Sequence, residues 1–104
     1  MHVVRTLSDC VNGWLCVWEW PEYSGAARSF RGTGVYNLGD IGWRDRISSI
    51  WNRTNVTVVT FDSRTYPVRD RVLYVDPSEA YRDLSHEPHD GGGSWNNKID
   101  KIGI

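Results

Sequence analysis

The two cysteines of this chain could form a disulfide. Between Cys10 and Cys16 lies the segment Val11-Asn12-Gly13-Trp14, and Asn-Gly is a strong signal for a tight hairpin because both residues accept a positive φ. Such a turn would place the two cysteines on facing strands, close enough to be bridged. We therefore predict a Cys10–Cys16 disulfide, with two ordinary buried thiols as the alternative. A disulfide would point to an oxidising compartment.

Other side chains with site chemistry form weaker patterns. The segment His86 to Asp90, with His89, could hold zinc, but a lone cluster beside a run of glycines is more often solvated. Three acidic residues could supply the paired carboxylates of a hydrolase, although acids on turns usually serve solubility: Glu19, Asp40 and Asp45. The sequence lacks a nucleophile turn, a phosphate-binding glycine loop and a cysteine in a catalytic setting. We therefore expect a protein that is not an enzyme.

Size and charge exclude several classes of protein. A chain of 104 residues fits one domain, and its six Trp and five Tyr are enough for a core. No apolar run approaches the roughly 20 residues of a membrane span. A net charge of −1 creates no long-range attraction for nucleic acid. We expect neither a membrane nor a nucleic acid as a partner, and no signal peptide is visible at the N-terminus.

Short runs of β-branched and aromatic residues predict an all-β chain. Residues 14–20 alternate with the period of a strand, and residues 56–61 form the clearest strand of the sequence. Further strands are expected at 27–30, 47–51, 72–75 and 99–104, with a weak edge strand at 3–8. The segment Asp76-Pro77-Ser78-Glu79 combines an N-cap, a first-turn proline and an acid. It predicts one short helix near 77–84.

The chain contains an internal repeat. Residues 43–50 (WRDRISSI) align with residues 95–102 (WNNKIDKI), so that Trp, a base and two Ile keep their spacing over a shift of 52 residues. A weaker pair joins residues 18–25 to residues 61–68. A repeat present twice implies two pseudo-symmetric units. We expect a first four-stranded Greek key at about 12–54 and a second at about 55–104, packed as one small sandwich.

The motifs of the first half resemble a known family. Two aromatics and a glycine (Trp18, Tyr23 and Gly25), followed by the stretch from Asp45 to Ser49, are similar to the βγ-crystallin Greek key. The longer pattern from Cys10 to Thr54 looks more narrowly like the Streptomyces-type metalloproteinase inhibitors that share this fold. The resemblance implies a βγ-crystallin-like sandwich and a non-enzymatic binding module.

The resemblance also implies calcium sites. In this family a stretch that begins with Asp or Asn and ends in Ser or Thr binds calcium, and each site is shared between the halves. It implies one site that pairs Asp45 with Asp100 and a second that pairs Asn97 with Ser48. Calcium takes six to eight oxygen ligands, several of them charged. The first pair supplies two carboxylates, whereas the second supplies none and should be weak or empty.

Basic residues surround these positions and oppose a cation. They are Arg44, Arg46, Lys98 and Lys101. Arg46 or Lys98 could pair with the carboxylates and replace the metal altogether. A salt-bridged polar end of the sandwich is therefore the alternative to a calcium site, and the implied role of Ser49 is to fix the bend of its motif by hydrogen bonding.

Trp20 stands apart from the other five tryptophans. It lies beside Pro21 at a bend, so we expect it to be exposed and to be a contact residue for a protein partner. The other five tryptophans lie where aromatics usually fill a core.

Three functions follow from these interpretations. The first is a metalloproteinase-inhibitor-like module with a protease as partner, which requires a rigid exposed loop; the loop 62–70 has no cysteine to hold it. The second is a calcium-responsive stability module. The third is a structural or surface protein whose partner is a subunit of an assembly such as a virion coat. The expected location is extracellular or the virion surface.

Overall fold

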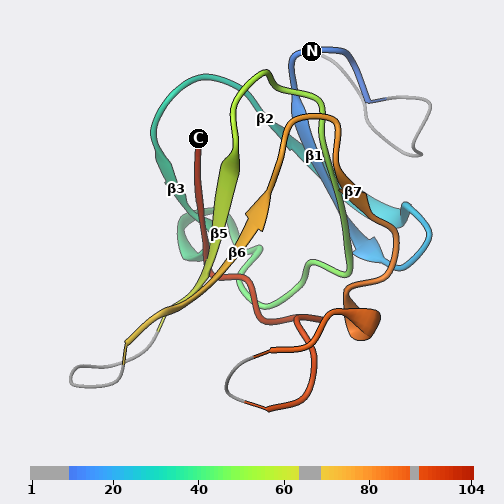
Figure 1. Cartoon of the computed structure of the whole chain (residues 1–104), viewed down its shortest axis with the longest axis vertical. Coiled ribbons are helices and arrows are strands. Elements are labelled where there is room, and N and C mark those ends of the chain that lie inside the picture. The colour runs from blue at the N-terminus through green and yellow to red at the C-terminus, as the bar shows by residue number, and fades with distance from the viewer. Residues whose placement is uncertain (1–9, 64–68, 90–91) are drawn as a thin grey trace.

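The chain folds as an all-β structure. The computed structural model describes residues 10–63, 69–89 and 92–104 (Figure 1). Its strands are β1 (Leu15–Trp20), β2 (Ser24–Phe30), β3 (Val35–Asn37), β4 (Ser49–Asn52), β5 (Val58–Asp62), β6 (Arg71–Val75), β7 (Ala80–Tyr81) and β8 (Lys101–Gly103). Two 3-10 helices, η2 (Leu38–Ile41) and η3 (Leu84–His86), connect them. The strands expected between residues 14 and 104 are confirmed with shifted ends, whereas the one expected at 3–8 lies outside the described residues.

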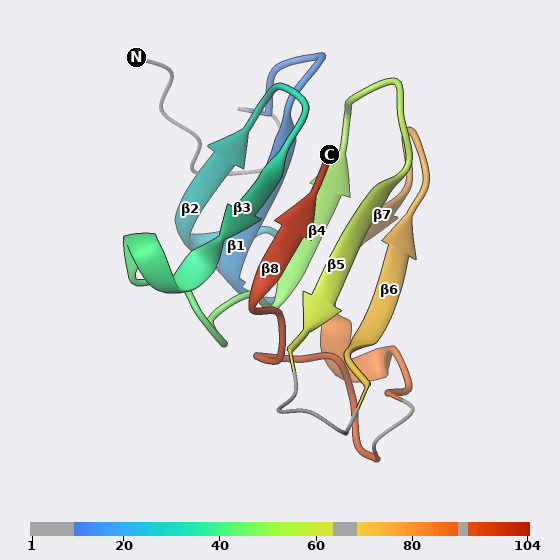
Figure 2. The ribbon, with the colours of Figure 1, turned by 90° about the vertical axis from the view of Figure 1, so that its left-hand side faces the viewer.

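The strands form two antiparallel sheets. One has the order β2-β1-β4-β7 and the other the order β3-β8-β5-β6; in Figure 2 the second sheet lies in front of the first. β3 pairs with β8 in the second sheet and not with its sequence neighbours β2 and β4. In the same way β7 pairs with β4 in the first sheet. Each sheet therefore takes three strands from one part of the chain and one from the other.

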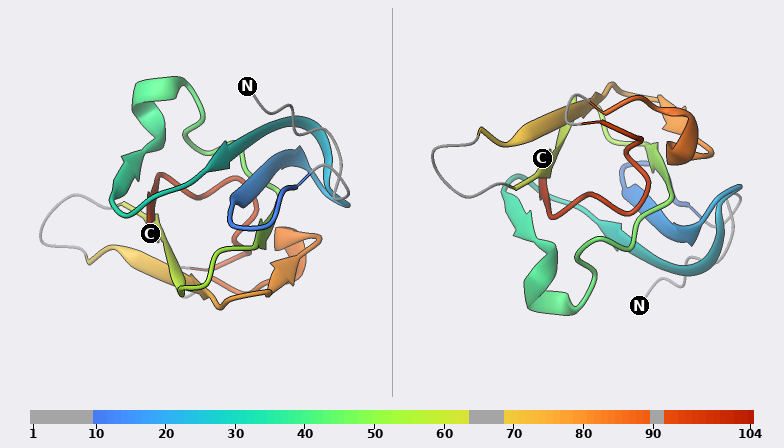
Figure 3. Two further views of the ribbon diagram at one scale, coloured as in Figure 1. Left: turned by 90° about the horizontal axis from the view of Figure 1, so that it is seen from above. Right: turned by 90° about the horizontal axis from the view of Figure 1, so that it is seen from below.

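The core residues lie between the two sheets, which Figure 3 shows end-on. They alternate along the strands with the period of two that a half-buried strand requires. The inner face of the first sheet supplies Leu15, Val17 and Ile50, all fully buried. Val58, Val75 and Ile102 come from the second sheet and are equally buried. Among the helices of the described residues, none has the length and apolar character to cross a membrane.

The short helix expected near 77–84 is not formed, and this prediction was wrong. The Glu79 amide donates to the Asp76 carbonyl at 2.9 Å, and the Asp76 amide donates to the Glu79 carboxylate at 3.0 Å, which closes a turn. The Ser78 amide then donates to the Asn52 carbonyl at 2.8 Å. Because the free edge of β4 offers backbone partners, the chain continues as β7 instead of winding into a helix.

The predicted disulfide is confirmed. Cys10 and Cys16 are bridged with their Cα atoms 6.1 Å apart, and both are buried. Together with Trp18 they form a second apolar cluster, outside the main core. Trp14 and Trp51, which we expected in the core, pack against this cluster and are only half-buried.

We expect the C10A/C16A double variant to be about 2 kcal/mol less stable than the wild-type protein. The bridge closes a short loop, so its stabilisation falls at the lower end of the usual range. Urea denaturation measures the difference, and wild-type protein kept under reductant should unfold at the same urea concentration as the variant. Equal midpoints for the oxidised wild type and the variant would contradict the expectation.

Candidate functional site

Two reciprocal hydrogen bonds join the repeated motifs at one end of the sandwich. The Asp45 amide donates to the Ile99 carbonyl at 3.1 Å, and the Asn97 amide donates to the Ile47 carbonyl at 3.0 Å. Asp45 and Asn97 have the same left-handed backbone, with φ of 58° and 57°. The repeat seen in the sequence is thus a pseudo-twofold arrangement in space. It brings together side chains of the two motif copies, such as Ser48 with Asn97 and Arg44 with Asp100.

The predicted neighbours Asp45 and Asp100 do meet, but Arg44 joins them. The Arg44 Nε atom donates to Asp100 Oδ1 at 2.9 Å and lies 3.8 Å from Asp45 Oδ2. The other oxygen of Asp100 accepts the Ser63 amide at 2.7 Å. Partial burial, a hydrogen bond to Asp100 and the charge of that carboxylate raise the pKa of Asp45 to about 6. Arg46 and Lys98 were the alternatives to a metal ion that the sequence suggested, and Arg44 takes that place instead.

The second predicted pair also meets. The Ser48 hydroxyl donates to the Asn97 Oδ1 atom at 3.1 Å. Both residues line a shallow cavity of about 410 Å³, whose other lining residues are Glu19, Trp20, Pro21, Asp45, Arg46 and Asn96. Arg46 pairs with Glu19 at 3.2 Å and stacks on Trp43 at 4.8 Å. Polar side chains therefore line the cavity next to Trp20 and Pro21, and Arg46 neutralises Glu19 while Asp45 adds a second carboxyl group.

This donor set is a poor match for calcium. Calcium needs six to eight oxygens, yet both oxygens of Asp100 already accept hydrogen bonds. Within residues 10–63, 69–89 and 92–104, no three His, Cys, Asp or Glu residues are grouped to hold a metal ion. An ion bound between Asp45 and Asp100 would have to displace the guanidinium of Arg44.

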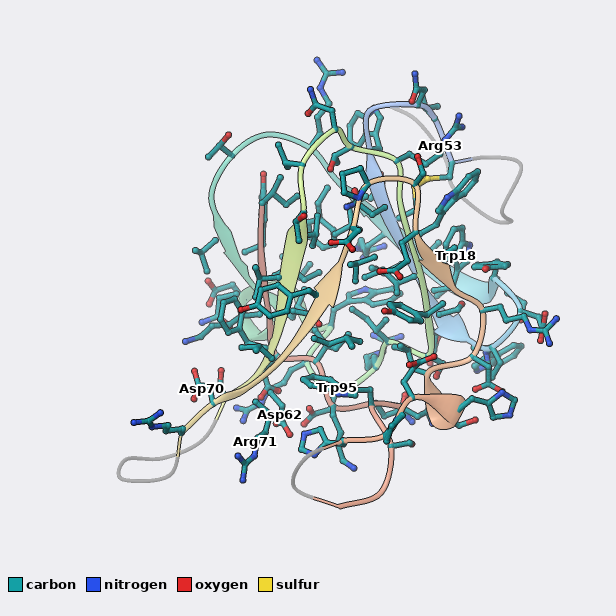
Figure 4. The ribbon with its side chains drawn as sticks, in the orientation of Figure 1. Trp18, Arg53, Asp62, Asp70, Arg71 and Trp95 are labelled. Atoms are coloured by element: carbon teal, nitrogen blue, oxygen red, sulfur yellow. A yellow bond between two sulfur atoms is a disulfide. The ribbon has the colours of Figure 1, made fainter. Side chains whose placement is uncertain are left out.

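The histidines considered for zinc point to different places. His89 is buried, and its Nε2 atom lies 2.8 Å from Asp62 Oδ2, while its ring packs on Trp95 at 4.8 Å. His86 is exposed and lies 3.7 Å from Asp83. Asp90 lies outside the described residues. Figure 4 shows Asp62 and Trp95 at the same end of the molecule, and His89 contacts both of these residues.

Trp20 is exposed, as predicted. It keeps 60% of its surface accessible, whereas Trp18, Trp43 and Trp95 are almost fully buried. Its ring lies directly against Gly25, where an added Cβ would come within 3.0 Å of the ring. One face of the indole therefore packs against the backbone of Gly25, although most of the surface of Trp20 faces solvent.

The corner that carries Trp20, residues 20–25, is fixed by hydrogen bonds. Ser49 donates its hydroxyl to the Trp20 carbonyl at 2.8 Å and accepts the Tyr23 amide at 3.2 Å. Ser24 donates to the Pro21 carbonyl at 2.7 Å. The role implied for Ser49 is confirmed. The contact between Gly25 and the ring of Trp20 was not predicted. The only signal for it in the sequence was the spacing of Tyr23 and Gly25.

Known structures share this fold. A structure described as "Evolution of the eye lens beta-gamma-crystallin domain fold" matches with a TM-score of 0.68 and 16% identity over 90% of this chain and 86% of that one. A βγ-crystallin from Ciona intestinalis matches with a TM-score of 0.61 and 18% sequence identity, over 88% of this chain and 98% of that chain. The N-terminal domain of Protein S matches with a TM-score of 0.61 and 14% sequence identity, over 86% of this chain and 92% of that chain. At these identities the likeness establishes the βγ-crystallin fold alone, as predicted.

The sequence also matches a family model. Residues 5–73 match the model of peptidase inhibitor family I36. This range includes β1 to β5 and the whole corner of residues 20–25, whereas the second copy of the repeated motif, residues 95–102, lies beyond it. No curated protein matches the chain.

We expect Gly25→Ala to destabilise the protein by about 2 kcal/mol and to change the tryptophan fluorescence. The added methyl group must displace the ring of Trp20, and φ of +80° strains any residue with a Cβ. Gly13→Ala is the matched control, because φ is +96° there but no atom lies within 4 Å of the added Cβ. If the two variants lose the same stability with unchanged emission, Gly25 does not seat the indole.

We expect Asp45→Asn to be more stable than the wild type at pH 7.5. The pKa of Asp45 is about 6 in the folded state, above the value of about 3.9 in an unfolded chain. The native state therefore binds the proton more tightly, and wild-type stability falls as the pH rises from about 4 to about 6. Asparagine cannot ionise, and it tolerates the left-handed backbone well.

The gain should stay under about 1 kcal/mol because the side chain of Asp45 is 54% exposed to screening solvent. It should vanish below about pH 4, where Asp45 is protonated. Urea unfolding between pH 3.5 and 7.5 measures it, with Asp40→Asn as the control that removes an exposed charge on η2. A constant difference across this range would show that ionisation of Asp45 is not the cause.

Proposed function

Because this chain belongs to peptidase inhibitor family I36, we propose that it inhibits a metalloprotease and that residues 20–25 form its contact surface. The chain is a βγ-crystallin-like module of that family. Its disulfide supports an extracellular site of action, because such bridges persist in oxidising compartments. The proposed partner is accordingly a secreted protease.

The observation that carries the proposal is the exposed Trp20, whose ring lies against Gly25. A binding loop that is ordered before it meets its partner avoids an entropic cost on association. Trp20 combines 60% exposure with a ring seated on Gly25, and its carbonyl is held by Ser49. Large aromatic residues of this kind often supply a major share of the affinity of an interface.

The shape around Trp20 also supports a protein partner. The cavity of about 410 Å³ beside the indole is lined by polar residues such as Asn96 and Asn97. An apolar anchor surrounded by polar groups is the usual composition of a protein interface, with a dry centre and a wet rim. Corner and cavity together form a continuous surface at the end of the sandwich that carries the pseudo-twofold axis.

The proposal is tested by titrating a thermolysin-like metalloprotease with the purified protein. We expect wild-type protein to inhibit, and Trp20→Ala to weaken inhibition by at least about 30-fold, the effect of losing a hot-spot side chain of about 2 kcal/mol. Tyr74→Ala is the matched control. Tyr74 is also a large exposed aromatic, at 57%, but it lies on β6 of the other sheet.

Two results would count against the proposal. Full protease activity at micromolar wild-type protein would remove the inhibitory function for that class of protease. Equal inhibition by wild-type protein and Trp20→Ala, together with a loss in Tyr74→Ala, would move the contact surface to the second sheet.

A structural role in an assembly is the second candidate, and one feature favours it. The outer face of the second sheet carries apolar side chains in two rows. Val35, Val59 and Tyr74 are aligned through the register of the strands, and so are Phe61 and Val72. Val35 and Tyr74 are 71% and 57% exposed. This role requires that purified protein associate with further copies of itself, whereas inhibition does not.

A further inference from the structure

We propose that the side chain of Arg44 takes the place of a calcium ion between Asp45 and Asp100. The resemblance to the family implies calcium at this position. One guanidinium nitrogen faces both carboxylates: Arg44 Nε lies 2.9 Å from Asp100 Oδ1 and 3.8 Å from Asp45 Oδ2. A single positive group thus links two acids that come from the two copies of the repeat. The inference does not depend on the inhibitory function.

The burial of Asp100 explains why a cation is needed there. Its side chain is only 6% exposed, and a buried carboxylate without a partner would strongly destabilise the fold. Arg44 is itself 62% exposed, so its own charge remains largely hydrated while one nitrogen reaches inward. The remaining oxygen of Asp100 accepts the Ser63 amide. The carboxylate is therefore satisfied without a metal ion.

The two basic residues that the sequence suggested as replacements for the metal serve different partners. Arg46 pairs with Glu19 and stacks on Trp43. Lys98 donates to the Ser94 carbonyl at 2.8 Å. These two side chains are engaged elsewhere, whereas Arg44 contacts both carboxylates.

A calcium ion would compete poorly with this arrangement. It would have to displace Arg44 and find most of its six to eight oxygens elsewhere. Arg44 is adjacent to Asp45 in the sequence and so is always present at high local concentration. Removal of the arginine frees Asp100 Oδ1 and takes away a repelling charge, so millimolar calcium should bind weakly between the two carboxylates, with water molecules as its remaining ligands.

The test compares melting temperatures in about 5 mM calcium and in chelator at pH 7.5. We expect the wild-type protein to show the same value in both. Arg44→Gln should melt lower in chelator and should recover by at least about 4 °C in calcium, as expected for a ligand that binds only the folded state. Arg82→Gln is the control, since it removes one positive charge from an exposed residue that pairs with Glu22; it should not respond to calcium.

A calcium-dependent shift of several degrees in the wild-type protein would overturn the proposal, and so would a folded Arg44→Gln variant that is insensitive to calcium, whatever its stability. If Arg44→Gln does not fold in either buffer, Arg44→Lys and equilibrium dialysis of the wild-type protein with radioactive calcium decide. Absence of bound calcium at about 1 mM in both proteins supports Arg44 in the place of a calcium ion. Binding of calcium by the wild-type protein overturns it.

Discussion

The structure depends on the two backbone hydrogen bonds that cross the pseudo-twofold axis. Asp45 donates to Ile99 and Asn97 donates to Ile47, so each motif copy supplies the partner that the other requires. The carbonyls that accept these bonds belong to the buried residues Ile47 and Ile99, and a buried carbonyl without a partner would be costly. The exchange places Ile47 and Ile99 in the centre of the core, both fully buried. It also fixes how the sheets meet, because each motif leads directly into a central strand, β4 or β8, of its own sheet.

This constraint explains, without reference to a ligand, why polar residues stand at positions 45 and 97. The crossing bonds require a left-handed backbone at positions 45 and 97, and Asp and Asn adopt that conformation more readily than most residues. An oxygen-bearing side chain is therefore expected at both positions for reasons of backbone geometry. The same side chains can then be used for metal binding in one protein and for ion pairing in another. In this chain, Arg44 and Asp100 form an ion pair there.

Sequence patterns predicted what depends on local chemistry and on the repeat. The spacing of Trp43 and Trp95 predicted equivalent burial, and Asn12-Gly13 predicted the turn that joins the cysteines. The missed features depend on tertiary partners. The segment from Asp76 to Glu79 has every local signal of a helix start, but the edge of β4 offers hydrogen bonds that a helix would forgo. Likewise the choice of Arg44 over Arg46 could not be predicted, because long basic side chains reach several acids and only the folded backbone selects one.

The disulfide supports the exposed corner of residues 20–25 from β1, the strand that carries both Cys16 and Trp20. From sequence alone, a bridge near the N-terminus had no evident connection to a binding loop. In the structure Cys10 and Cys16 pack with Trp18, and the ring of Trp18 meets that of Tyr23 edge-on at 5.2 Å. Tyr23 in turn belongs to the corner of residues 20–25. The bridge therefore stiffens the base on which Trp20 is carried, and a βγ-crystallin sandwich can present a rigid loop without a cysteine inside that loop.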